Sequence, residues 1–235
     1  MRAVCNLPPC AMPVERFRLL PKKEYKEGVK TSRYPDLRSS VGHYDFHQHA
    51  CFMAYDFPKM REQTNEARRE QWMGAKILTH EMVHFASTGG LHDFSRTLNE
   101  GMTETIARDI FRDDVRGHFP HVEEDPNEVY AMETCLWTTM KSMRPELEPG
   151  VMADYWQEDC ESACERIEEH VGAEFRRVLA GQQRPTFVQY QAMNNMLLKK
   201  DHPDINVITK RIQTANCQLL VEEALATMRP PRVAS

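Results

Sequence analysis

The chain has 235 residues, of which 41% are hydrophobic and 28% are charged, values ordinary for a globular protein with one substantial core. Its formal net charge is −5 with both signs well mixed, which argues against a dedicated nucleic-acid binder. No run approaches the roughly 18–20 apolar residues that span a bilayer, and the N-terminus lacks an apolar stretch of signal-peptide length. We therefore expect no transmembrane segment, and a protein that is cytoplasmic or secreted without a cleaved signal peptide.

The first half of the chain predicts a short irregular region, a small β element and a long helix. Residues 1–40 contain five prolines and many basic residues and predict an irregular N-terminal segment. Residues 41–56 are rich in aromatic and β-favouring residues and predict one or two short strands. Residues 59–87 contain no proline and a single glycine, Gly74, and predict one long helix or two helices with a bend there.

The remainder of the chain predicts further helices, separated by Gly181, Pro185 and Pro203. The fold is therefore predicted to be mainly α, an α+β arrangement with a helical C-terminal region. The seven cysteines are odd in number and lack C-x-x-C spacing, so free and mostly buried thiols are expected, with disulfides as the alternative. The additional helices are predicted at about residues 97–112, 125–143, 150–180, 184–200 and 203–228.

The sequence His80-Glu81-Met82-Val83-His84 places two histidines one helical turn apart. Each residue advances about 100° around an α-helix, so His80 and His84 share a face and can bind one metal ion. Glu81 lies beside that face, which suits a general base acting on water better than a metal ligand. Catalytic zinc normally has three protein ligands, so a third is expected from another element.

The next predicted helix carries Glu100 and Glu104, which are also four residues apart and share a face. One carboxylate can bind the metal while the other accepts the outer ring N–H of a liganding histidine. Glu104 itself, Glu128 and Glu133 are alternative third ligands. Acidic residues near a helix start are favoured without any metal as well, so a solvated helix face is the simplest alternative.

The His-Glu-x-x-His sequence, followed by a helix with Leu98-Asn99-Glu100-Gly101 and an acidic residue one turn later, resembles the gluzincins. These are zinc metallopeptidases of the thermolysin-like and aminopeptidase-like kinds. The resemblance covers about residues 72–108, and the spacing of fifteen residues between the second histidine and the glutamate is slightly shorter than in familiar members. The resemblance implies Zn²⁺ bound by His80, His84 and Glu100, with Glu81 as general base and Glu104 supporting a histidine.

The resemblance further implies hydrolysis of a peptide or protein substrate. No counterpart of the aminopeptidase motif that grips a free amine is present, so an endopeptidase is expected. By analogy with small stand-alone peptidase domains, a bacterial effector or toxin is one context for such a chain. The oxyanion of the reaction needs a hydrogen-bond donor. Tyr130 is the favoured donor, and the other residues of suitable type are His118, His121, Tyr155 and Tyr190.

Two alternative functions stay open from the sequence. One is a non-catalytic, zinc-stabilised helical interaction module, and the other is a helical binding protein in which the motif is accidental. A second histidine cluster at His43, His47 and His49 suggests a strand beside the cleft, a second metal site or ordinary surface residues. On the gluzincin interpretation, residues 41–145 form a zincin-like catalytic region and residues 146–235 pack on it. The oligomeric state is not indicated.

Overall fold

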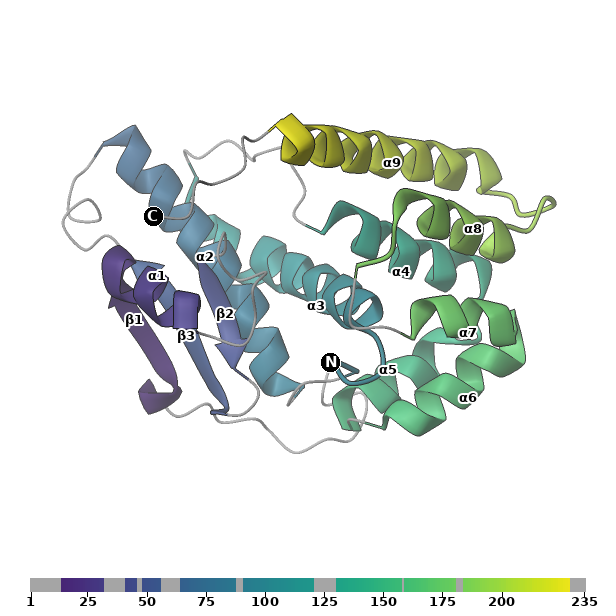
Figure 1. The fold of residues 1–235 in the computed structure, drawn as a ribbon, viewed down its shortest axis with the longest axis horizontal. Coiled ribbons are helices and arrows are strands. Elements are labelled where there is room, and N and C mark those ends of the chain that lie inside the picture. Colours follow the sequence, from purple (N-terminus) through teal and green to yellow (C-terminus); the bar gives the residue numbers. More distant parts are fainter. Residues whose placement is uncertain are drawn as a thin grey trace. The chain divides into compact units, whose positions relative to one another are not determined.

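The computed structural model describes residues 14–31, 41–45, 48–55, 64–87, 91–120, 130–157, 159–180 and 184–228 (Figure 1). Within these residues the protein is mainly helical with a small sheet near the N-terminus, which confirms the predicted fold class. No helix in this part of the chain is both long and apolar enough to cross a membrane. The elements are η1 (Val14–Arg16), β1 (Phe17–Pro21), α1 (Lys22–Thr31), β2 (Gly42–Asp45), β3 (Ala50–Tyr55), α2 (Asn65–Ala86), α3 (Arg96–Ile110), η4 (Phe111–Val115), η5 (Arg116–His118), α4 (Ala131–Met143), α5 (Glu148–Gln157), α6 (Cys160–Val171), α7 (Ala173–Leu179), α8 (Phe187–Leu197) and α9 (Ile205–Met228).

The three strands form a mixed sheet in the order β1-β3-β2. β1 runs parallel to β3, with Phe17 opposite Cys51, whereas β2 is antiparallel to β3, with Gly42 opposite Met53. The predicted strands at residues 41–56 are therefore confirmed as β2 and β3. The expectation of an irregular segment is wrong for residues 17–31, because β1 gains its hydrogen bonds from a distant strand that proline counting cannot reveal.

Helix α2 is the long helix that the sequence predicted, and it continues unbroken through Gly74. It begins after Thr64, whose side-chain oxygen accepts a hydrogen bond from the backbone N–H of Ala67. β2 packs closely on it, because a Cβ atom at Gly42 would lie only 2.6 Å from a methyl group of Ile77. The helix that carries both histidines is thus anchored against the sheet.

Two compact units can be distinguished. The first contains the sheet, α1, α2 and the chain from Thr103 to Pro126, and the second contains Leu91–Met102 and most of the chain from Asn127 onward. The boundary falls inside α3, which is one continuous helix. In the second unit α9 lies along α4 and α8 (Figure 1). The division predicted at residues 40 and 145 stays a prediction.

The sequence predicted one helical stretch over residues 150–180, and this prediction is wrong because three separate helices, α5, α6 and α7, cover that range. Asp159 caps α6 by accepting the backbone N–H of Ser162, and Gly172, with φ of 112°, separates α6 from α7. The helices predicted at 184–200 and 203–228 are confirmed as α8 and α9. Helix α4 starts at Ala131, and the predicted start near residue 125 lies outside the described residues.

Candidate metal centre

Two imidazole rings project from the last third of α2 into a buried environment. His80 and His84 are only 6% and 4% exposed, and their Nε2 atoms lie 3.1 Å apart. The ring planes are inclined at 77°, so the rings meet at their edges rather than stacking. Burial of two polar rings is costly unless their nitrogen atoms are satisfied. The nitrogen atoms therefore require partners.

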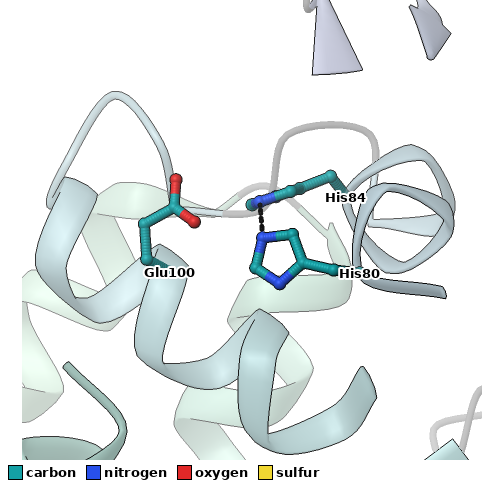
Figure 2. A group of neighbouring side chains, drawn as sticks. All are labelled: His80, His84 and Glu100. Atoms are coloured by element: carbon teal, nitrogen blue, oxygen red, sulfur yellow. Dashed lines mark hydrogen bonds between the residues drawn. The ribbon is translucent and has the colours of Figure 1, made fainter. Parts of the chain in front are cut away.

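Glu100 completes a group of three ligand-type side chains. One carboxylate oxygen of Glu100 and one nitrogen of each histidine all lie within 4.8 Å of one another. Figure 2 shows the carboxylate on α3 directed toward both rings on α2. Among the described residues this is the one set of three or more His, Cys, Asp or Glu side chains that converges in this way. The structure thus brings together the three residues that the sequence predicted as ligands.

The residues on either side of Glu100 explain how α3 is held. The Asn99 side chain is fully buried and accepts a hydrogen bond from the backbone N–H of Leu91, which ties the preceding turn to the helix. A Cβ atom at Gly101 would overlap the backbone carbonyl of Glu133 on α4. A side chain at this position would therefore force the two helices apart. The Asn-Glu-Gly sequence is consequently a packing requirement as well as a chemical one.

The outer nitrogen of each ring meets a side chain of α3. His80 Nδ1 lies 2.9 Å from Glu104 Oε2, and His84 Nδ1 lies 3.3 Å from Thr103 Oγ1. An ionised carboxylate only accepts hydrogen bonds, so Nδ1 of His80 is the donor, and in the neutral form of the ring its Nε2 carries a lone pair. Glu104 was predicted to contact a histidine, whereas Thr103 was missed. The signal for Thr103 was its place three residues after Glu100, on the same helix face.

The donor set fits a small divalent cation. When Thr103 accepts the Nδ1–H of His84, both Nε2 lone pairs are directed into the same space, and a cation between them removes their repulsion. Two imidazoles on a tetrahedral zinc ion, at about 2.0–2.1 Å each, have nitrogen atoms about 3.3 Å apart. The observed separation of 3.1 Å is close to that value. Two imidazole nitrogens and a carboxylate oxygen are ligands that zinc accepts.

Glu104 is charged although it is buried. Burial alone raises the pKa of its carboxyl, but the hydrogen bond and charge of His80, followed by the charge and hydrogen bond of Arg108, outweigh burial and lower the pKa below its ordinary value. Arg108 Nε donates to Glu104 Oε1 over 2.9 Å. The two oxygens of this carboxylate therefore have different partners, one of them the ring of His80.

Glu81 lies next to His80 on α2 and is 7% exposed. Its backbone carbonyl accepts a hydrogen bond from the thiol of Cys51 on β3, at 3.4 Å. Burial, and then the negative charge of Glu81, raise the pKa of the Cys51 thiol, so this group stays protonated as a donor. The central strand of the sheet thus holds the helix at the residue predicted to be the general base.

The alternative third ligand Glu133 is engaged elsewhere. Both of its carboxylate oxygens contact the guanidinium of Arg184, with Nε 2.8 Å from Oε1 and Nη2 3.3 Å from Oε2. Glu133 is therefore part of an ion pair and is absent from the converging group. The other alternative, Glu128, lies outside the described residues.

The predicted oxyanion donors occupy different environments. Tyr155 and Tyr190 are fully buried, and burial followed by the charge of Glu133 raises the pKa of Tyr190. His118 is exposed at the end of η5, and His121 lies outside the described residues. Tyr130 is partly exposed and has a left-handed backbone, with φ of 57°, immediately before α4. Of the candidates that the structure describes, Tyr130 alone combines partial exposure with a left-handed backbone directly before a helix.

The described members of the second histidine cluster bind tyrosines. His43 Nδ1 lies 2.9 Å from the hydroxyl of Tyr25, and its ring stacks on Phe52. His49 Nδ1 lies 2.9 Å from the hydroxyl of Tyr44, and His49 is in an exposed turn rather than in a strand. Neither belongs to a metal-binding group among the described residues. His47 lies outside them.

A hollow of about 750 Å³ in the second unit contains none of the predicted site residues. Its walls include the thiols of Cys160 and Cys164, the carboxylate of Asp93 and the guanidinium of Arg176. These donors do not converge as His80, His84 and Glu100 do. The hollow therefore does not coincide with the converging group of ligand-type side chains.

No family model, no curated protein and no solved structure matches this chain. The case for a metal centre stands on the donor set, its burial and the hydrogen bonds that orient it.

Proposed function

We propose that this protein is a zinc metallopeptidase of the gluzincin type, acting as an endopeptidase. The observation that carries the proposal is the convergence of His80, His84 and Glu100, with both outer ring nitrogens held by α3. A structural zinc site is normally closed by four protein ligands, whereas three leave a position for water, as catalysis requires. The gluzincin spacing of these residues in the sequence supports the same assignment.

Each residue has a defined role in this proposal. His80, His84 and Glu100 hold the ion, which would lower the pKa of water and polarise the scissile carbonyl. Glu81 takes the proton of the attacking water and returns it to the leaving amine, which completes the proton balance of hydrolysis. Tyr130 donates a hydrogen bond to the oxyanion that develops on the carbonyl.

A peptide substrate is supported by the sheet. Among the described residues β2 is an outer strand of the sheet, which is the position at which an extended peptide adds to a sheet. β2 also packs on α2, the helix that carries His80 and Glu81. A role as an effector or toxin peptidase belongs to the same proposal by analogy only.

The variant Glu81→Gln tests the proposal, because it removes the base and leaves the three ligands in place. Wild type loaded with zinc should cleave members of a proteome-derived peptide library, read by mass spectrometry. Glu81→Gln should retain one zinc ion per chain while cleavage falls at least about 100-fold. Equal cleavage by both proteins, or no cleavage by the zinc-loaded wild type, would contradict peptidase activity. Retained zinc without any cleavage by either protein would favour a zinc-stabilised interaction module.

A further inference from the structure

Arg108 extends the chain of contacts that starts at the metal centre. It lies one turn after Glu104 on α3, and its Nε–H donates to Glu104 Oε1 over 2.9 Å. The other oxygen, Oε2, lies 2.9 Å from Nδ1 of His80. Glu104 has a side chain only 8% exposed, and that of Arg108 is 29% exposed. The buried carboxylate thus bridges a partly exposed guanidinium and a buried imidazole.

This bridge restricts the carboxylate more than either contact could alone. A glutamate side chain has three rotatable bonds, and its terminal torsion is broad. A hydrogen bond to a single oxygen leaves the carboxylate plane free to rotate about that contact. Anchoring the second oxygen on the Nε–H of the planar guanidinium restricts this rotation, and with it the direction in which His80 presents Nε2.

We propose that Arg108 is a positioning residue for the metal centre, which acts through Glu104 to orient His80. This inference rests on the proposed function, because it assigns Arg108 a role toward the same ion. In this role Arg108 acts through the carboxylate of Glu104, with which it forms a hydrogen bond and an ion pair.

Arg112, one turn further along the chain, provides a matched comparison. Its guanidinium bonds Asp109 and Asp113, and all three side chains are exposed. It has the same chemistry and nearly the same place in the sequence, but its carboxylate partners contact no histidine in the described contacts. Arg112→Gln is therefore a control for losing an arginine from this part of the chain.

The experiment measures zinc affinity of the full chain by competition with a chromophoric chelator. Arg108→Gln should raise the zinc dissociation constant roughly 3- to 10-fold, and Glu104→Gln should raise it about 10- to 100-fold. The double variant Glu104→Gln/Arg108→Gln should match Glu104→Gln alone, since the proposed effect of Arg108 on His80 passes through Glu104. Arg112→Gln should bind zinc like wild type. Melting temperatures of the metal-free proteins show whether each variant is folded.

Arg108→Lys gives a second route if Arg108→Gln folds poorly. It keeps the positive charge but loses the planar guanidinium and its Nε–H, so its zinc affinity should lie between those of wild type and Arg108→Gln. An unchanged zinc dissociation constant in folded Arg108→Gln would overturn the inference. It would also be overturned if the fold-change in the double variant equalled the product of the fold-changes in the two single variants. Failure of the wild type itself to bind zinc would instead overturn the proposed function and remove the basis of this inference with it.

Discussion

Glu104 and Glu133 are both buried glutamates that bind an arginine, yet they serve different parts of the molecule. Glu104 divides its oxygens between Arg108 and the ring of His80. Glu133 directs both oxygens at Arg184. One carboxylate is linked to the metal centre, and the other forms an ion pair between α4 and Arg184, three residues before α8. Residue type and burial do not distinguish them, whereas the partner of the second oxygen does.

The largest expected difference between the two carboxylates is in metal affinity. Glu104→Gln should raise the zinc dissociation constant about 10- to 100-fold, because the ring of His80 loses its charged acceptor. Glu133→Gln should leave that constant within about 2-fold of wild type. It should lower the free energy of unfolding by about 1–2 kcal/mol, a value reduced because the freed Arg184 side chain is 38% exposed and can reach water.

Chelator competition measures the first quantity for both variants, and denaturant unfolding of the metal-free proteins measures the second. If Glu133→Gln weakened zinc binding as much as Glu104→Gln does, the proposed separation of the two carboxylates would be wrong.

A smaller difference is expected between two glycines, Gly74 on α2 and Gly101 on α3, in how their replacement by alanine changes the free energy of unfolding. Gly101→Ala should lower the free energy of unfolding by about 1–3 kcal/mol, because its methyl group meets the rigid backbone of α4 at Glu133. Gly74→Ala in α2 should be neutral or stabilising by up to about 1 kcal/mol, since nothing lies within 4 Å of the new methyl group. Unfolding by urea measures both. A stable Gly101→Ala protein would mean that α3 and α4 do not approach as described.

The smallest expected effect is the contribution of His43, on β2 of the sheet, to the pH dependence of stability. Burial lowers the pKa of His43 below its ordinary 6.5, although the nearby Asp45 opposes the shift. The unfolded chain therefore binds a proton more readily than the folded one. The contribution of neutral His43 to stability should be fully present above about pH 6.5 and should be lost as pH falls toward the lower folded value.

Urea midpoints at pH 7.5 and pH 5.5 test this prediction. The fall in midpoint between the two pH values should be smaller in His43→Gln than in wild type. An equal fall in both proteins would show that His43 does not contribute to the pH dependence.

Local patterns were sufficient to predict the parts of the site that share a helix. The spacing of His80 and His84, and of Glu100 and Glu104, follows directly from the helical repeat. Thr103 and Arg108 lie on the same stripe as Glu100 and Glu104, at three and eight residues from the first of them, so a stricter use of that repeat would have found them. The partners of Thr103 and Glu104 on α2, His84 and His80, could not be chosen without knowing how the two helices pack.

Features that depend on distant contacts were missed for a physical reason. β1 is stabilised by β3, more than thirty residues away, and nothing in Phe17–Pro21 indicates that pairing. The break between α6 and α7 depends on the positive φ of Gly172, which the surrounding helix-favouring residues concealed. Glu133 could be rejected as a ligand only after its pairing with Arg184 was seen.

The most direct test of the central claim is the zinc content of protein purified without added metal. Wild type should contain one zinc ion per chain by elemental analysis. His80→Ala should contain almost none, because losing a ligand weakens binding by more than the roughly 10- to 100-fold typical of outer partners. His118→Ala, which removes an exposed histidine outside the group, should keep the wild-type content. Zinc-free wild type, or undiminished zinc in His80→Ala, would contradict the assignment of this site.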